Sequence, residues 1–445
     1  MFETLPGAVR TALDTLTRSG VQGVLVGGCV RDALMGLTPH DYDIAAGAPP
    51  ERIKEAFAGY PLRLEGEKHG TVTPVIGSVP VQITSFRLES GYRDGRHPDE
   101  VRFTDDLLKD LKRRDFTVNA MAWSPENGLE DPFGGQEDLK NGLLRCLGDP
   151  DVRLTEDALR ILRGLRFISR LGFSAEPATA AAMSRHAEAL KSVSRERVLE
   201  ELTGVLTGTF ALQALTAFPD ILFAAIPQLF PLYHCPQKSV YHIYDVWEHT
   251  LHVLDEVRPR TPRLCWAALL HDCAKPQTRH RDRKGFDHYP GHPQEGARLT
   301  ESILKSLKMP AAMLQDIRTL VLWHDERFTP DQVPLMLYRV GPGLFDDLIA
   351  LQRADMLAHA ERIRKDAGKL DALLEARDEA LENGACIGYA TLAVSGNDLK
   401  ALGYEGKALG DTLEWALMQV LRGRLPNEKD TLLEAVGPAE TQENT

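Results

Sequence analysis

The segment LVGGCVRDALMGLTPHDYDIAA, Leu25–Ala46, decides the fold class of the first part of this chain. A short apolar run ends in two glycines, a helix-like stretch with an Arg-Asp pair follows, and two aspartates stand one residue apart before a second apolar run. Glycines at a turn into a helix N-terminus let backbone N–H groups approach phosphate oxygens closely. The segment therefore predicts a mixed α/β domain with a phosphate-binding turn.

The two aspartates, Asp41 and Asp43, carry like charges close together. On a strand, their spacing puts both side chains on one face, where two carboxylates repel each other unless a cation lies between them. Mg²⁺ prefers oxygen ligands of this kind. Arg31 stands one turn into the expected helix, where it can grip a phosphate. The segment thus predicts a magnesium–triphosphate site, whereas a tight turn with two solvated aspartates is the structural alternative.

The composition of the 445 residues is that of a chain with packed cores, because 43% are hydrophobic and 26% charged. No apolar run approaches the ~20 residues that cross a bilayer, and the N-terminus is typical of an amphipathic helix rather than a signal peptide. We therefore expect a soluble cytoplasmic protein that contacts no membrane. The net charge of −12 argues against non-specific nucleic-acid binding by the whole surface, but a local basic groove needs only a few Lys and Arg. The six cysteines form no CxxC pair, which favours reduced thiols.

Strand and helix patterns alternate over residues 20–125, and helix patterns dominate from about Asp149 onward. The runs GVLVGG, DYDIAA, GTVTPVIG and VPVQITSF predict strands, and RLTEDALRILRGLRFISRL, RERVLEELTGVL, CWAALLHDCAK and KLDALLEARDEALEN predict amphipathic helices. The fold class that follows is α+β, with a small mixed sheet and its helices first and a long all-helical remainder after it.

Four ordered motifs resemble those of one family. GGCVRDALMGLTPHDYDIA resembles the signature of the class II tRNA nucleotidyltransferases, the bacterial CCA-adding enzymes and their poly(A) polymerase relatives. LKRRDFTVNAMAW, DPFGGQEDL and LTEDALRILRGLRF resemble the second, third and fourth motifs, the last usually written EDxxR. Good matches cover roughly residues 20–210. The resemblance implies a head with the nucleotidyltransferase fold of DNA polymerase β.

The resemblance also implies a reaction, in which the 3′-hydroxyl of an RNA attacks the α-phosphate of CTP or ATP and pyrophosphate leaves. Asp41 and Asp43 would hold two Mg²⁺ ions, and positioning and charge neutralisation carry most of such a reaction. The residues carried over as nucleotide contacts are Gly28, Arg31, Arg114, Asp157, Arg160, Arg163 and Arg166.

Asp157 and Arg160 stand three apart, which puts them on one side of a helix. Ionised Asp accepts hydrogen bonds and Arg donates them, while cytosine and adenine both offer an exocyclic amine donor beside a ring-nitrogen acceptor. The pair can therefore accept both bases and reject guanine and uracil. The structural alternative for Asp157 is an acid in the first turn of a helix that Thr155 caps.

Four arginines fall within an arc of about 120° on the same expected helix, namely Arg160, Arg163, Arg166 and Arg170. A solvated polar face is one explanation. However, arginines without an acid among them repel each other, and a triphosphate or an RNA backbone would relieve that repulsion. We therefore expect this face to bind phosphates.

Two further features concern the product and the metal. Ser85–Asp106 resembles the family's flexible loop, which implies that the pocket reorganises between C and A addition and favours CCA or A addition over CC addition. Gln82 stands where the family usually has an acidic residue. A glutamine supplies no charge to a metal, so we assign no third carboxylate.

A second set of candidate ligands lies in the helical remainder, in the motifs VWEHTL, LLHDCAK, GHPQEGA, LWHDE and RADMLAH. Their histidines and aspartates could hold one or two divalent ions, and the candidates are His249, His271, Asp272, His292, His324 and Asp355. The set resembles that of the all-helical HD phosphohydrolases, a domain that one branch of the bacterial CCA-adding enzymes carries. It implies metal-dependent phosphohydrolysis, for example of 2′,3′-cyclic phosphates or 3′-phosphates of RNA ends. A scaffold that only holds the tRNA acceptor arm is the alternative.

The expected domains are a nucleotidyltransferase head over residues 1–145, a helical, RNA-binding neck over 146–235, an HD domain over 236–370 and a helical tail over 371–445. CCA addition to tRNA is the leading hypothesis. The alternatives are an A-adding enzyme or poly(A) polymerase of the same fold, an HD phosphohydrolase whose head only binds RNA, and an RNA-binding protein without activity. The EDxxR motif weighs against a polymerase, because only an enzyme that handles both C and A needs the Asp–Arg pair. The Asp41–Asp43 pair weighs against an inert head.

Overall fold

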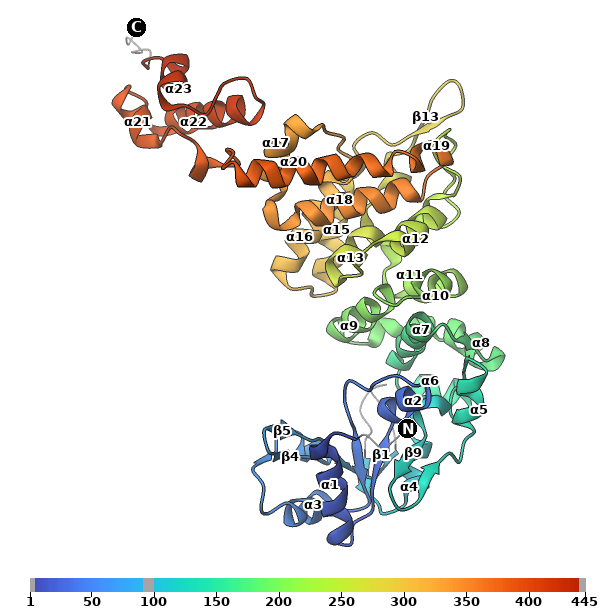
Figure 1. Ribbon diagram of the computed structural model, residues 1–445. Coiled ribbons are helices and arrows are strands. Elements are labelled where there is room, and N and C mark those ends of the chain that lie inside the picture. The colour runs from blue at the N-terminus through green and yellow to red at the C-terminus, as the bar shows by residue number, and fades with distance from the viewer. Residues whose placement is uncertain (1–4, 91–99, 440–445) are drawn as a thin grey trace. The chain divides into compact units, whose positions relative to one another are not determined.

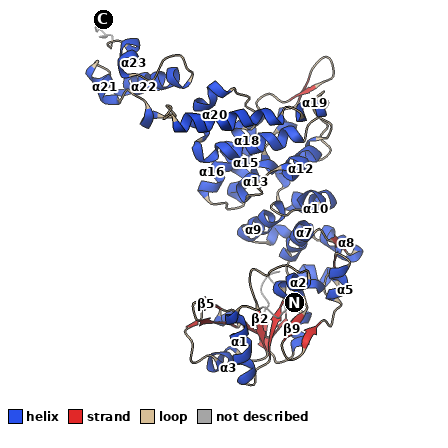
Figure 2. Ribbon diagram, viewed as in Figure 1, coloured by secondary structure: helices blue, strands red, loops and turns tan. Residues whose placement is uncertain are grey.

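The computed structural model describes residues 5–90 and 100–439, which belong to two compact units, Met1–Pro227 and Gln228–Thr445 (Figure 1). Strands gather in the N-terminal part of the first unit, and helices make up almost all of the second (Figure 2). This confirms the α+β class. Within the part of the chain that the structure describes, no helix combines the length and the apolar character that a membrane span requires.

A mixed sheet forms the base of the first unit. Within the described residues it has eight strands, in the order β10-β9-β1-β2-β6-β4-β3, with β5 beside β4. β2 and β6 run parallel, whereas β1 pairs antiparallel with both β2 and β9. The strands are β1 (Gly23–Val26), β2 (Ile44–Ala46), β3 (Leu62–Arg63), β4 (Thr71–Ile76), β5 (Val79–Pro80), β6 (Ile83–Ser85), β9 (Ala122–Ser124) and β10 (Gly128–Glu130). A separate hairpin joins β7 (Arg87–Ser90) to β8 (Glu100–Phe103).

Both faces of this sheet are covered, which explains why the GVLV run of β1 is apolar at every position. Leu25 packs on one face with residues of α1 (Gly7–Arg18) and α3 (Pro50–Ala56). Val24 and Val26 pack on the other face with Leu107 and Leu111 of α4 (Leu107–Lys112). Two short helices complete the sheet domain, α2 (Gly28–Leu34) directly after β1 and α5 (Gly135–Lys140).

The expected helix RLTEDALRILRGLRFISRL is interrupted, and that expectation was wrong. The structure has α6 (Pro150–Glu156) and α7 (Leu159–Leu171), with Asp157 between them in an extended conformation. Thr155 therefore caps no helix, because it lies inside α6 and its hydroxyl donates to the Asp151 carbonyl at 2.8 Å. The remaining elements of the first unit are β11 (Leu143–Leu144), β12 (Ser174–Ala175), α8 (Pro177–Arg185), α9 (Arg195–Leu206), α10 (Ala211–Ala217) and α11 (Pro219–Ala225). α7 packs against α9 and α10.

The second unit is a helical body. Its centre is formed by α12, α13, α16 and α18, which pack against one another, and by α15, which packs on α16. The elements are α12 (Val246–Glu256), α13 (Pro262–Leu270), α14 (Lys275–Thr278), β13 (His280–Arg281), β14 (Asp287–His288), α15 (His292–Ser306), α16 (Ala311–Trp323), α17 (Val333–Val340), α18 (Pro342–Leu357), α19 (Glu361–Arg364), α20 (Asp371–Glu382), α21 (Gly396–Ala401), α22 (Gly406–Leu421) and α23 (Lys429–Val436). The HD pair lies just past the end of α13 rather than within a helix.

All six cysteines lie among the described residues, and all are buried free thiols. This confirms the expectation of reduced cysteines. Burial raises the pKa of the Cys29 and Cys265 thiols to about 11 and that of the Cys146 and Cys273 thiols to about 12. Thiols of this kind carry almost no thiolate at neutral pH and are poor nucleophiles.

Candidate active site and candidate metal centre

The glycine turn of the first motif lies between β1 and α2, as the sequence predicts. Gly27 has φ of 74° and ψ of −131°, a conformation that side chains disfavour. A Cβ added there would also lie 3.2 Å from Nη1 of Arg114. Gly27 is therefore required both by the backbone and by the guanidinium that approaches it. Gly28 follows as the first residue of α2.

Asp41 and Asp43 lie in the loop just before β2, so the expectation that both stand on a strand was wrong. The backbone hydrogen bonds between β1 and β2 nevertheless extend to Asp43, because Val26 N–H donates to the Asp43 carbonyl at 3.1 Å. Both aspartates line one depression together with Gln82. Withdrawal from water raises the pKa of Asp43, the positive charge of Arg114 opposes this, and the negative charge of Asp41 adds to it. The two carboxylates therefore act on each other.

A cavity of about 730 Å³ opens beside the glycine turn, and most of its lining comes from the first, second and fourth motifs. It has seven arginines against three aspartates. The arginines are Arg31, Arg87, Arg113, Arg114, Arg160, Arg163 and Arg197, and the aspartates are Asp43, Asp115 and Asp157. A cavity with this excess of positive charge attracts a polyanion, and guanidinium groups match phosphate oxygens in geometry.

Six of the seven residues carried over as nucleotide contacts line this cavity; Arg166 does not belong to its lining. Arg166 instead forms an ion pair of 3.0 Å with Glu201 of α9. Arg31 donates to Asn119 Oδ1 at 2.8 Å and pairs with Asp32 at 2.7 Å. The guanidinium of Arg31 also lies 5.2 Å from the centre of the Phe167 ring, in the range of a cation–π contact.

The arginine face of α7 is less repulsive than the sequence indicated. Arg160 pairs with Glu156 at 2.6 Å, and Arg163 pairs with Asp115 at 2.8 Å. Asp115 and Glu201 come from other parts of the chain, so the pattern of one helix could not show them, whereas Glu156 stands four residues before Arg160 in the same motif. The arginines thus have acidic partners within the chain, and phosphate binding by this face stays a prediction. What favours phosphate binding is the excess of arginines over acids in the cavity.

The Asp115–Arg163 pair predicts a pH-dependent contribution to stability. Burial raises the pKa of Asp115, but Arg163 outweighs it and holds this pKa at about 2, below the ordinary 3.8. Since the folded pKa is depressed, the stabilisation is present above pH 4 and is lost as the pH falls towards 2. We expect Asp115→Asn to destabilise α7 by about 2 kcal/mol at pH 7, at 1.36 kcal/mol per pKa unit. The difference from wild type should shrink as the pH falls towards 2.

Hydrogen–deuterium exchange of the α7 amides measures this local stability across the pH range. Asp14→Asn, which changes an exposed carboxylate on α1, is the matched control and should leave that exchange unchanged. Equal protection of α7 in wild type and in Asp115→Asn at pH 7 would contradict the prediction.

Asp157 and Arg160 both line the cavity, although Asp157 precedes α7 rather than standing on it. Asp157 Oδ1 accepts from Leu159 N–H at 3.0 Å, and Oδ2 lies 3.3 Å from Arg197. Asp157 therefore accepts a hydrogen bond from the first residue of α7 and also forms an ion pair with Arg197 of α9. Arg197 was missed because it stands 40 residues away on α9, and no local pattern connects it to the motif.

The third motif supports the site from outside. Asp131 accepts from the backbone N–H groups of Gly135 and Gln136 at 2.7 and 2.8 Å, which caps α5. Asp138 accepts from Thr117 Oγ1 at 2.6 Å. These bonds fix α5 against the turn that follows Asp115. Of the loop Ser85–Asp106, Arg87 and Val101 reach the cavity; residues 91–99 lie outside the described residues.

The six candidate HD ligands converge in the second unit, from α12, α15, α18 and the ends of α13 and α16. Asp272 lies at the centre. His271 Nε2 lies 3.1 Å from its Oδ2, while His292 Nε2 and His324 Nε2 lie 3.4 and 3.6 Å from its Oδ1. His249 Nε2 lies 3.0 Å from Asp355 Oδ1 and 3.7 Å from Asp272 Oδ2. Two metal-sized groups result, His249–His271–Asp355 and Asp272–His292–His324.

Backbone carbonyls orient three of these rings. His271, His292 and His324 each place Nδ1 within 2.7–2.9 Å of the carbonyl oxygen three residues earlier. Because a carbonyl only accepts, Nδ1 carries a proton, and in the neutral form of each ring the lone pair is on Nε2, which faces the centre. Outer hydrogen bonds of this kind are typical of metal-ligating histidines. Among the described residues, none gives the buried Nε2 of His271 a hydrogen bond of good geometry. The donor set therefore fits a divalent ion.

Burial and charge set the ionisation of this centre. Burial lowers the pKa of His249 to about 4, against the pull of Asp355. Burial opposes ionisation of the two aspartates. His271 and Lys275 beside Asp272, and His249 and His359 beside Asp355, outweigh burial and hold the pKa of both aspartates well below the ordinary value. Near neutral pH the carboxylates are thus ionised and His249 is neutral, which is the form that binds metals.

Two histidines join this centre that the sequence analysis did not select. His242 and His359 lie with His249 in a third metal-sized group. His359 could have been found, because it stands four residues after Asp355 and so on the same face of a helical turn. His242 lies in an irregular segment, where no periodicity points to it.

Comparison with known proteins gives a consistent result along the chain. Family models match residues 24–145, as the poly A polymerase head domain, residues 172–218, as an RNA- and SrmB-binding site of polymerase A, and residues 296–436, as tRNA nucleotidyltransferase domain 2. The chain is 33% identical to the CCA-adding enzyme of Levilactobacillus brevis over 96% of each chain. It is 46% identical to that of Lactobacillus helveticus over 47% of this chain and 52% of the relative.

Solved structures agree with these relatives. The fold is similar to the crystal structure of the Bacillus stearothermophilus CCA-adding enzyme in complex with CTP, with a TM-score of 0.75 and 26% identity over 96% of each chain. The likeness to the Thermotoga maritima CCA-adding enzyme complexed with tRNA has a TM-score of 0.60 at 20% identity and concerns the fold alone.

Proposed function

Because the chain belongs to the family of CCA-adding enzymes, we infer that it adds C, C and A in turn to the 3′ end of tRNA, using CTP and ATP and releasing pyrophosphate. The observation that carries this function to the present residues is the arginine-rich cavity with Asp43 in its lining. A nucleoside triphosphate brings the negative charge that this cavity lacks, and Asp41 and Asp43 stand where its phosphates would meet a cation.

Asp41 and Asp43 fit as ligands of Mg²⁺, because they are two oxygen donors in one depression whose like charges act on each other. When bound, the magnesium supplies Lewis acidity at the α-phosphate and at the attacking 3′-hydroxyl. Gln82 shares the depression but brings no charge. We propose that the two aspartates hold the magnesium and that Gln82 supplies no third carboxylate; Glu65 also lines the depression, beside Arg63.

The arginines stabilise the negative charge of the triphosphate and of the leaving pyrophosphate. Arg31, beside the glycine turn, and Arg114, near Asp43, are placed to hold triphosphate oxygens, and their charge offsets the negative charge that accumulates as pyrophosphate leaves. Arg163 forms an ion pair with Asp115 and lines the same cavity as Arg31 and Arg114. Because these guanidiniums already pair with Asp32, Asp110 and Asp115, they need little rearrangement on binding.

Asp157 and Arg160 are our proposed base readers. Asp157 accepts from the exocyclic amine of cytosine or adenine, and Arg160 donates to the ring nitrogen beside it. Guanine and uracil present the opposite polarity at these positions, so each would leave buried polar groups unpaired. Both residues line the cavity, and Leu159 N–H and Arg197 already fix the Asp157 carboxylate.

Replacing Asp157 by alanine should therefore lower kcat/KM for both CTP and ATP. The loss of a hydrogen bond to a charged group costs about 1.5–3 kcal/mol, or roughly 10–150-fold. Discrimination against UTP should fall by a similar factor, as measured by single-nucleotide incorporation. Asp157→Ser is the matched control for the helix cap, because serine still accepts from Leu159 N–H but does not reach the base. Unchanged discrimination in the alanine variant would contradict the assignment.

Primer extension tests the function as a whole. The full-length protein with Mg²⁺ is given tRNA transcripts that end at the discriminator base or at CC, with CTP, ATP or both. Growth of the first transcript by three nucleotides and no more is the expected result. Addition of a single A to the CC transcript alone would show an A-adding enzyme instead, and failure to extend either transcript would overturn the proposal.

A second function is favoured by the converging Nε2 atoms of the helical body. We propose that His249, His271, Asp272, His292, His324 and Asp355 form an HD-type metal centre that hydrolyses phosphate esters at RNA ends, such as 2′,3′-cyclic phosphates. Four of these residues, Asp272, His292, His324 and Asp355, line a cavity of about 380 Å³, whose lining also includes Lys275 and Arg327, two cations suited to a phosphate. The identity of the metal is part of this proposal, and histidine-rich ligands favour a transition metal over Mg²⁺.

We further propose the division of the chain that the sequence predicts, with a head over residues 1–145, a neck over 146–235, an HD domain over 236–370 and a tail over 371–445. Action on tRNA places the protein in the cytoplasm in this proposal.

A further inference from the structure

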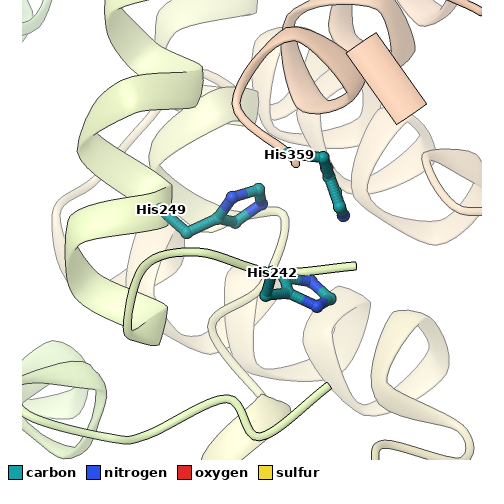
Figure 3. A group of neighbouring side chains, drawn as sticks. All are labelled: His242, His249 and His359. Atoms are coloured by element: carbon teal, nitrogen blue, oxygen red, sulfur yellow. The ribbon is translucent and has the colours of Figure 1, made fainter. Parts of the chain in front are cut away.

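Three imidazole rings from separate segments meet in the second unit (Figure 3). His249 stands on α12, His242 in the segment before α12, and His359 just after α18. One ring nitrogen from each lies within 4.8 Å of the other two. The ring centres are 4.5 Å apart for His242 and His359, 4.9 Å for His249 and His359, and 5.4 Å for His242 and His249.

In both His242 and His359, the ring nitrogen Nδ1 already has a hydrogen-bond partner. His359 Nδ1 lies 2.6 Å from the Asp355 carbonyl oxygen, so Nδ1 donates and the lone pair is on Nε2. His242 Nδ1 lies 2.7 Å from Ser239 Oγ. Its Nε2 lies 3.4 Å from Lys275 Nζ, and since an ammonium only donates, this contact requires an unprotonated Nε2. Both rings thus offer a lone pair on the nitrogen that is farther from the backbone.

The two segments that carry these rings are tied together. Ala360 N–H donates to the Tyr241 carbonyl at 2.9 Å. Ala360 directly follows His359, and Tyr241 directly precedes His242. The Arg362 guanidinium lies 4.2 Å from the centre of the Tyr241 ring. Ser239 Oγ accepts from His242 N–H at 3.2 Å. The backbone therefore holds the rings side by side, and their arrangement does not depend on a bound ligand.

We propose that the Nε2 atoms of His242, His249 and His359 form a three-imidazole subsite for a borderline transition-metal ion, of the class of Zn²⁺, Co²⁺ or Ni²⁺. Imidazole suits these ions, whereas Mg²⁺ prefers oxygen ligands, and the trio contains no carboxylate. The ammonium of Lys275 lies near this subsite, and Asp272 Oδ2, at 2.6 Å from it, offsets part of its charge. The subsite lies beside the six HD ligands and adds to them.

The subsite and the HD ligands share His249. Its Nε2 also lies 3.0 Å from Asp355 Oδ1, within the group His249–His271–Asp355. One ring nitrogen binds one ion at a time, so an ion on the trio takes His249 from that group. The group Asp272–His292–His324 has no ligand in common with the trio and can be filled at the same time. This inference concerns metal binding and holds whether or not the centre hydrolyses phosphate esters.

Metal titration of the full-length protein tests the subsite. The protein is stripped with a chelator and titrated with Zn²⁺ for stoichiometry and with Co²⁺ for its visible ligand-field spectrum. The double variant His242→Gln/His359→Gln should lose the Co²⁺ band of the trio, while its Zn²⁺ stoichiometry should equal that of wild type, because the released His249 completes the group His249–His271–Asp355. His280→Gln, at an exposed histidine of β13, is the matched control and should bind as wild type does. A Co²⁺ spectrum of the double variant that equals that of wild type overturns the proposal.

Further variants guard against a loss of structure. His324→Gln should weaken the Asp272–His292–His324 ion but keep the Co²⁺ band of the trio, which a merely structural role of the histidines would not produce. If the double variant fails to fold, the single variants decide, because each removes one imidazole and should weaken Zn²⁺ binding at the trio at least ~10-fold. Two single variants with wild-type affinity would overturn the proposal as well. A tenfold excess of Mg²⁺ should leave the bound Zn²⁺ in place.

Discussion

Replacement of Asp43 by asparagine should abolish nucleotide addition to tRNA for practical purposes. Asparagine keeps the size and one oxygen of the side chain but removes the charge that faces Asp41 across the depression. Metal Lewis acidity contributes several kcal/mol to such transfers. A loss of about 4 kcal/mol corresponds to roughly 10³-fold in kcat, and we expect at least this loss in the primer-extension assay with saturating CTP.

The same variant should bind tRNA as wild type does, because Asp43 is acidic and its removal lessens the repulsion of RNA phosphates. Asp41→Asn should behave like Asp43→Asn, and Asp14→Asn, remote on α1, should retain full activity. A kcat within threefold of wild type in either variant at Asp41 or Asp43 would mean that the magnesium site lies elsewhere. Loss of tRNA binding together with activity would show a folding defect, and circular dichroism and gel filtration detect that.

Replacement of Asp272 by asparagine should produce the largest effect in the second unit. Asp272 is fully buried and lies within 2.6–3.7 Å of four histidines and a lysine. Removal of an outer partner alone typically costs 10–100-fold in metal affinity, so loss of this central ligand should cost about 100-fold or more. Metal analysis after dialysis measures the effect, and hydrolysis of a 2′,3′-cyclic nucleotide should fall to the background rate.

CCA addition by the Asp272→Asn variant should stay within about twofold of wild type, because the head residues belong to the other unit. Asp331→Asn changes an exposed carboxylate of the same unit and should retain both metal and hydrolysis. Full metal content with no hydrolysis in wild type would leave a metal site without the proposed activity. Undiminished metal binding in Asp272→Asn would refute the centre itself.

The sequence predicted the sheet domain well where local chemistry decides the structure. The GVLV run is apolar at each position because both faces of β1 are covered, and Gly27 needs its positive φ. It predicted the helices less well at Asp157. There the extended residue between α6 and α7 is stabilised by Arg197 of α9, a contact that lies 40 residues away along the chain.

The candidate sites show the same division between local and distant information. The six candidate HD ligands could be selected because their histidines and aspartates recur through the helical part of the sequence, with His271 and Asp272 adjacent. His242 could not, because its place depends on the hydrogen bond between Ala360 and Tyr241, which joins two distant segments. The pairing of Arg163 with Asp115 and of Arg166 with Glu201 was likewise invisible in the periodicity of α7. Periodicity gives the face of a helix, but the charges opposite that face come from the tertiary fold.

The buried thiols have a practical consequence for following this protein in motion. All six cysteines are inside the described structure, and burial raises the pKa of most of them. Maleimide dyes react with exposed thiolates, so the native chain is close to silent towards them. A single cysteine introduced at an exposed position, such as Leu88→Cys in the β7–β8 hairpin, becomes a selective label without removal of any native cysteine. Fluorescence from that label would report how the hairpin responds as CTP gives way to ATP during synthesis of one tRNA end.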